Sequence, residues 1–190
     1  MTGFTESTAE DAALICLDSP GWRIAHGSDI AWYTWDRTSD RRNLSMPLSQ
    51  QEFEAILADE TKEIVQDLVW GEDEDRSPAR EFRATVASAT GYPLFVIGRY
   101  NPLAGTLSYA LIHRGAGRIY ALDLGADHHN PDCNRIGEKH KHRWTEASGD
   151  KQAYVPEDIT EPWDRPVAVW EQFCTEARIQ HTGRMEPPAA

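Results

Sequence analysis

The sequence predicts an α+β fold, in which a largely antiparallel sheet (a meander) of about five to seven strands carries two or three packed helices. Two observations lead to this prediction. From residue 81 onward, apolar segments of strand length alternate with short links that contain Gly or Pro, which favours tight antiparallel reversals. On both sides of this run lie segments whose apolar residues recur at helical spacing.

The first 75 residues are predicted to form a helix, a hairpin and an acidic helix. Residues 8–17 favour a short amphipathic helix, residues 22–37 a β-hairpin, and residues 38–47 a polar loop. In residues 49–70, Ser49 and Glu52 have capping-box spacing, and the apolar residues that follow indicate one long helix.

The second half is predicted to hold the sheet and a final helix. The helix starts within residues 161–166, with Asp164 or a neighbour as its cap and Pro166 in its first turn. We predict two units, residues 1–75 and residues 80–185, with a single domain over 1–185 as the alternative. The expected strands are 81–89, 93–100, 106–113, 118–124, 139–144 and 152–156.

Composition and charge limit the classes of protein to consider. The net charge is −12. The sequence contains no run of about 18 apolar residues, so no membrane-spanning helix is predicted. The three cysteines, Cys16, Cys133 and Cys174, are odd in number and far apart, which predicts free thiols in a reducing cytoplasm. No P-loop motif and no Gly-x-Ser-x-Gly elbow is present.

The stretch "DHHNPDCNRIGEKHKHRW", residues 127–144, holds four of the seven histidines. If residues 139–144 form a strand, His140 and His142 share one face, about 6.5–7 Å apart along the backbone. Two imidazoles at that spacing can converge on one metal ion or one phosphate group. In a structural alternative, the two rings only fill a sheet face beside Trp144.

One interpretation of these residues is a divalent metal site, with zinc or manganese as the ion. A long loop after the strand at 118–124 would bring further ligands to the pair of histidines. The predicted ligands are His129, His140, His142 and Asp127, with Asp123 or Glu146 as alternative carboxylates.

The first hypothesis for function is a small bacterial phosphodiester-cleaving enzyme, ribonuclease-like and of toxin or defence type, whose histidine cluster acts with a metal ion or by acid–base chemistry. RNA would bind the basic segment 135–151. Because strand alternation places the cations on the face opposite the histidines, a bulge or twist would be needed to bring them together. The catalytic candidates are His140, His142, Arg143 and Glu146, and the phosphate-binding candidates are Lys139 and Lys141.

Two resemblances concern the same segment. The arrangement "HNPD…G-x-x-HKHRW…AYVPEDIT" resembles an uncharacterised bacterial domain family of prophage or defence-neighbourhood type over residues 81–160, which implies a bacterial context and no particular activity. "DHH", residues 127–129, resembles the metal motif of the DHH phosphoesterases. The further aspartate motifs of those enzymes are not found, so no residue role is carried over.

Two non-catalytic alternatives stay open. Residues 49–75 contain ten acidic side chains and one lysine, so an acidic helix there would bind a basic protein partner or mimic nucleic acid. Alternatively, the histidines would hold a metal ion without turnover, as in a metal-binding regulator.

Overall fold

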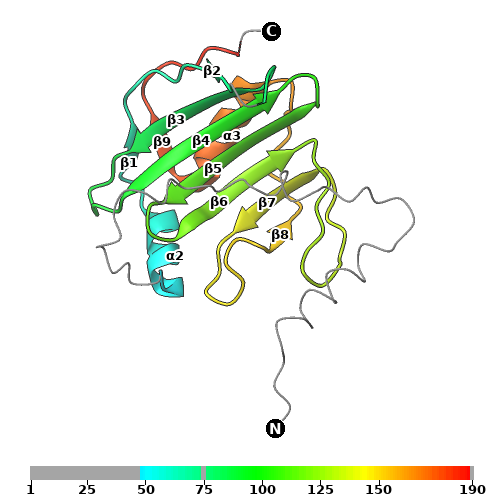
Figure 1. Cartoon of the computed structure of the whole chain (residues 1–190). Helices are drawn as coiled ribbons and strands as arrows, with labels where there is room; N and C mark the ends of the chain where they lie inside the picture. Colours follow the sequence, from blue (N-terminus) through cyan, green and yellow to red (C-terminus); the bar gives the residue numbers. More distant parts are fainter. Residues whose placement is uncertain (1–47, 74–75, 189–190) are drawn as a thin grey trace. The chain divides into compact units, whose positions relative to one another are not determined.

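The computed structural model describes residues 48–73 and 76–188 of the chain (Figure 1). The predicted helix at 8–17, the hairpin at 22–37 and the loop at 38–47 lie outside the described residues. The structural statements below concern the described residues alone.

A seven-stranded antiparallel sheet dominates the described structure (Figure 1). Its strands are hydrogen-bonded in chain order, from β2 to β8 without a crossover, so the predicted meander is confirmed. Together with two helices and a two-stranded parallel sheet, this confirms the α+β fold class. The strands are β2 (Gly71–Glu72), β3 (Arg80–Val86), β4 (Leu94–Asn101), β5 (Thr106–His113), β6 (Gly117–Leu124), β7 (Lys139–Arg143) and β8 (Ala153–Tyr154).

Strand alternation divides the sheet into two chemically different faces. One face carries the apolar core, in which Tyr109 and Leu122 pack with Phe53 of one helix and Phe173 of the other. On β6, Asp123 is the neighbour of Leu122 and therefore lies on the opposite face. The side chain of Asp123 therefore lies on the face of the sheet opposite the core.

The pairing of β5 with β6 contains a β-bulge. Leu111 pairs with Tyr120, but Ile112 pairs with Arg118, so Ile119 is the extra residue. Ile119 joins the apolar core and is 1% exposed. Because a bulge reverses the alternation beyond it, Arg118 takes the face on which Asp123 lies.

Helix α2 (Gln50–Ala58) begins with the predicted capping box. The Ser49 amide donates to Glu52 Oε2 at 2.9 Å, and the Glu52 amide donates to Ser49 Oγ at 3.2 Å. The predicted helix to Trp70 is wrong, because α2 ends at Ala58. An acidic helix over residues 49–75 therefore does not exist.

Side-chain hydrogen bonds of two residues, Asp59 and Lys62, stabilise the end of α2 at Ala58. The Asp59 carboxylate accepts hydrogen bonds from the Thr61 amide at 2.8 Å and the Ser88 hydroxyl at 2.6 Å. The buried Lys62 ammonium donates to the carbonyls of Ile56 and Leu57 at 2.6 and 3.2 Å, which satisfies acceptors that a helix end leaves open. Burial lowers the pKa of Lys62 to about 8. The chain then continues as a strand.

That strand, β1 (Lys62–Ile64), pairs in parallel with β9 (Ile179–His181) near the end of the chain. Helix α3 (Pro166–Ala177) precedes β9 and has Pro at its start, as predicted. Its N-cap is Arg165, the residue next to Asp164, and it makes no side-chain cap hydrogen bond. Arg178 adopts a left-handed conformation (φ 51°), which ends α3 and turns the chain into β9.

The core joins α2 and β1 with the sheet and α3, and thus includes residues from both sides of the predicted boundary at 75–80. The division of the whole chain into units stays a prediction, since residues 1–47 lie outside the description. Cys174 is a buried free thiol, as predicted. Cys16 lies outside the described residues, so the prediction of three free thiols stays a prediction. Within residues 48–73 and 76–188, no helix has the length and apolar character needed to cross a membrane.

Candidate metal centre

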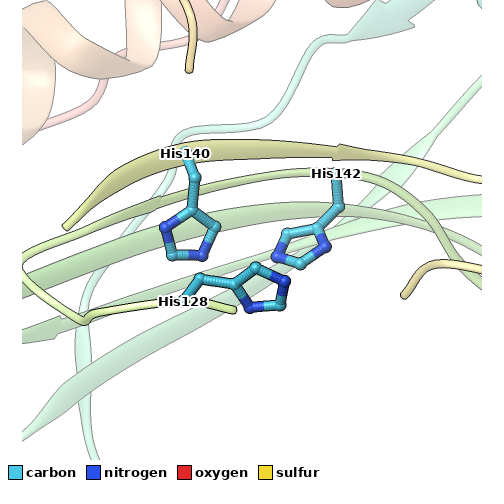
Figure 2. Close-up of side chains that lie close together, drawn as sticks. All are labelled: His128, His140 and His142. Atoms are coloured by element: carbon cyan, nitrogen blue, oxygen red, sulfur yellow. The ribbon is translucent and has the colours of Figure 1, made fainter. Parts of the chain in front are cut away.

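Three imidazole rings converge on the face of the sheet opposite the core (Figure 2). His140 and His142 come from β7, and His128 comes from the loop between β6 and β7. One ring nitrogen of each residue lies within 4.8 Å of the corresponding nitrogens of the other two. The ring centroids are 4.7–5.0 Å apart.

Strand pairing places the first two rings beside a carboxylate. In the register between β6 and β7, His140 lies opposite Asp123 and His142 lies opposite Ala121. Side chains that share a face of neighbouring strands lie close together. Alternation along β7 thus places both imidazoles next to Asp123.

The loop from β6 to β7 is folded so that it carries His128 to the same place. The Asn130 side chain pairs with the backbone of Ala153 in β8, accepting at 2.8 Å and donating at 3.0 Å. The Ile136 amide donates to the His128 carbonyl at 2.9 Å, which closes the loop on itself. These hydrogen bonds hold the loop against the edge of the sheet next to β7.

Backbone carbonyls determine which nitrogen of each β7 histidine carries a proton. His140 Nδ1 lies 3.0 Å from the Gly137 carbonyl, and His142 Nδ1 lies 2.8 Å from the Asp150 carbonyl. A carbonyl oxygen only accepts, so both Nδ1 atoms must be the donors. In the neutral ring, Nε2 then presents a lone pair, as metal-ligating histidines with a fixed tautomer do.

The Asp123 carboxylate faces both Nε2 atoms. Asp123 Oδ2 lies 3.6 Å from His140 Nε2 and 3.4 Å from His142 Nε2. These distances exceed the about 2.7–2.9 Å of a charge-assisted N–H···O hydrogen bond. The 3.4 Å distance equals the edge of a tetrahedron of ligands, about 3.3–3.4 Å, around a zinc ion with bonds of about 2.0–2.1 Å, and the 3.6 Å distance is somewhat longer.

Burial favours the neutral form of His140 and His128 beside an ionised carboxyl group. His140 and His142 are only 3% and 2% exposed, and burial lowers the pKa of His140 to about 4. Burial also lowers the pKa of His128. For Asp123, burial raises the pKa, but the interaction with His142 and the charge of Arg118 outweigh it, so the pKa lies below its usual value.

One further feature of the cluster points to a cation. His128 Nε2 is buried and has no hydrogen-bond partner among the described residues, although buried polar atoms are normally paired. A bound divalent cation would use this open nitrogen and would be attracted by the Asp123 carboxylate beside the rings.

The other predicted ligands lie elsewhere. His129, adjacent to His128, is not one of the three converging histidines. Asp127 forms an ion pair with Arg135 at 2.9 Å. The Glu146 carboxylate lies 3.4 Å from the Gln50 amide at the start of α2.

The predicted phosphate-binding and catalytic cations are engaged away from the imidazoles. Lys139 Nζ donates to the Ile159 carbonyl at 3.1 Å, and Arg143 pairs with Glu54 at 3.3 Å. Lys141 is fully buried on the core-facing side of β7, where its ammonium pairs with Asp158 and Glu176. None of these three residues lies on the histidine face. The bulge in β6 places Arg118 on that face instead.

The acidic side chains expected to bind a partner also contact this chain. Glu54 pairs with Arg143, and the Asp59 carboxylate accepts from Thr61 and Ser88. Asp67 Oδ1 accepts from the Arg184 amide at 2.8 Å. Of these three contacts, only the one between Glu54 and Arg143 offsets a negative charge.

Fold and site together define a small α+β domain with a buried cluster of histidines on one face of an antiparallel meander. Over residues 48–179 the chain matches the model of a family of unknown function, DUF6978, and it belongs to that family. No curated protein and no solved structure matches the chain. The matched region includes the whole sheet, both described helices and all three converging histidines.

Proposed function

We propose that this protein binds one divalent transition-metal ion through His128, His140, His142 and Asp123. The observation that carries the proposal is the convergence of His128, His140 and His142, whose ring nitrogens lie within 4.8 Å of one another, with Asp123 Oδ2 at 3.6 and 3.4 Å from the two Nε2 atoms of β7. The fixed Nδ1 donors support it, because they leave both Nε2 atoms as acceptors.

The donor set favours zinc over manganese. Imidazole nitrogen suits Zn²⁺ and neighbouring transition metals, whereas Mn²⁺, Mg²⁺ and Ca²⁺ prefer carboxylate, carbonyl and water oxygens. Three nitrogens and one oxygen also complete a tetrahedral shell, which is the usual coordination of Zn²⁺. Of the two ions expected from the sequence, zinc therefore fits these residues better.

A shell of four protein ligands supports a structural or regulatory ion, as in the metal-binding regulator alternative. A catalytic zinc site usually has three protein ligands and an open position for water. Ribonuclease-like cleavage stays a prediction, and the engagement of Lys139, Lys141 and Arg143 elsewhere does not favour it.

Metal content of untagged protein tests the proposal. After removal of metal with a chelator and titration with Zn²⁺, we expect one tightly held ion per chain in the wild type. The double variant His140→Ala/His142→Ala is expected to retain none after gel filtration, because both Nε2 ligands are gone. His113→Ala is the control, since His113 lies on β5 outside the cluster.

A wild-type protein that retains no stoichiometric Zn²⁺, or a double variant that retains as much as the wild type, would contradict the proposal. The same preparations should be incubated with RNA. Equal cleavage by the wild type and the double variant would exclude a histidine-dependent ribonuclease.

A further inference from the structure

Arg118 contacts the proposed site from the first residues of β6. Its Nη1 lies 3.3 Å from Asp123 Oδ2, the same oxygen that faces both Nε2 atoms. Its Nε donates to Asp150 Oδ2 at 2.7 Å. The guanidinium thus connects two carboxylates, one from β6 and one from the turn after β7.

The second contact extends to a histidine. Asp150 offers its carboxylate to Arg118 and its backbone carbonyl to His142 Nδ1, at 2.8 Å. A residue that fixes Asp150 therefore also fixes the acceptor that orients the His142 ring and sets its tautomer. One side chain in this way influences both a carboxylate ligand and an imidazole ligand.

The β-bulge explains why Arg118 is there. Strict alternation from Asp123 would place Ile119 on the histidine face and Arg118 in the core. The extra residue sends Ile119 into the core and turns Arg118 toward the histidines. Bulges often re-aim a side chain in this way beside a functional site.

We infer that Arg118 is a positioning residue of the metal site, one that holds Asp123 and, through Asp150, His142 in ligating geometry. The inference rests on the proposed function. Outer residues that orient metal ligands typically contribute about 10–100-fold to metal affinity, and we expect Arg118 to act in this range.

Co²⁺-loaded protein provides the test, because the visible d–d absorption of bound Co²⁺ reports the geometry of its ligands. We expect Arg118→Gln to weaken Co²⁺ and Zn²⁺ binding by about 10–100-fold and to change the d–d spectrum. Arg118→Lys should be intermediate, since a single ammonium keeps the charge but cannot bridge both carboxylates as a guanidinium does.

Arg99→Gln is the matched control. Arg99 lies on β4, has a similar exposure of 28% against 23%, and pairs with the Glu81 carboxylate at 3.4 Å. We expect it to leave metal affinity and spectrum unchanged. If Arg118→Gln does not fold, Arg118→Lys makes the same comparison with a smaller expected change.

The failures of the two proposals are distinguishable. A wild-type protein that binds neither Co²⁺ nor Zn²⁺ would overturn the proposed function. A wild type that binds metal, with Arg118 variants of unchanged affinity and spectrum, would overturn only the role of Arg118, even if their melting temperatures fell.

Discussion

Replacing His128 by alanine is expected to lower Zn²⁺ affinity by more than about a hundredfold, the upper range for residues that only orient ligands. Replacing the adjacent His129 is expected to change it no more than a few-fold. The two residues are neighbours in the chain and identical in type, but only His128 joins His140 and His142. The pair therefore separates direct ligation from a general effect of histidines in this loop.

Competition of each purified variant with a chromogenic zinc chelator measures this difference. Circular dichroism of the metal-free proteins checks that both variants retain the fold. Equal affinities of the two variants would contradict the assignment of His128, and a larger loss in His129→Ala would favour the ligand expected from the sequence.

Replacing Lys141 by methionine is expected to lower the free energy of unfolding by about 2–3 kcal/mol. Breaking a buried ion pair costs about 3–5 kcal/mol, and the cost is smaller here because the Asp158 and Glu176 side chains are 45% and 32% exposed. Zn²⁺ affinity should stay the same, since Lys141 points to the opposite face from His140 and His142. This outcome would assign Lys141 to stability and not to phosphate binding.

The effect should depend on pH in a defined direction. Burial alone would raise the pKa of Glu176. The hydrogen bonds from Lys141 and Tyr120 lower it by more, so the pKa lies below its ordinary value of 4.5. A carboxyl group with a lowered pKa in the folded state stabilises the fold above its unfolded pKa and loses that contribution as the pH falls through the folded pKa. The difference between wild type and Lys141→Met should therefore be full at pH 7 and shrink below about pH 4.5.

Urea denaturation at pH 7 and at several acidic pH values measures these differences. Lys139→Met is the matched control, because its ammonium makes one 3.1 Å hydrogen bond to a carbonyl and the residue is exposed. Adding Glu176→Gln to Lys141→Met should recover part of the loss, since the neutral amide needs no cation. A loss in Lys141→Met no larger than in Lys139→Met would show that the ion pairs contribute little.

The sheet could be predicted from sequence because its pairings are local. Strands that follow one another through short Gly- or Pro-containing links become neighbours in an antiparallel meander, so no distant partner had to be identified. Alternation in "KHKHRW" likewise indicated that His140 and His142 share a face and that Lys141 lies on the other, and the structure has this arrangement.

The end of α2 depended on non-local partners. Ile64 and Leu68 fit the helical spacing that begins at Phe53, so the pattern alone favoured one long helix. In the structure Ile64 lies in β1, whose partner β9 is near the other end of the chain. Tertiary pairing of this kind overrides local propensity, and a single sequence does not reveal it.

The site was only partly predictable for a similar reason. A loop has no periodicity that indicates which of two adjacent histidines turns inward, so His128 and His129 could not be distinguished. Arg118 was missed because strict alternation places it in the core, and only the bulge at Ile119 reverses that. Asp123 was the ligand easiest to predict, since antiparallel pairing of the two predicted strands places it opposite His140.

X-ray absorption at the zinc edge, on untagged protein loaded with one equivalent of Zn²⁺, tests the central claim most directly. We predict a four-coordinate ion with nitrogen and oxygen ligands at about 2.0–2.1 Å and the multiple-scattering pattern of imidazoles. Sulfur ligands at about 2.3 Å, or a six-coordinate shell of water and carboxylate oxygens, would contradict a site built from His128, His140, His142 and Asp123.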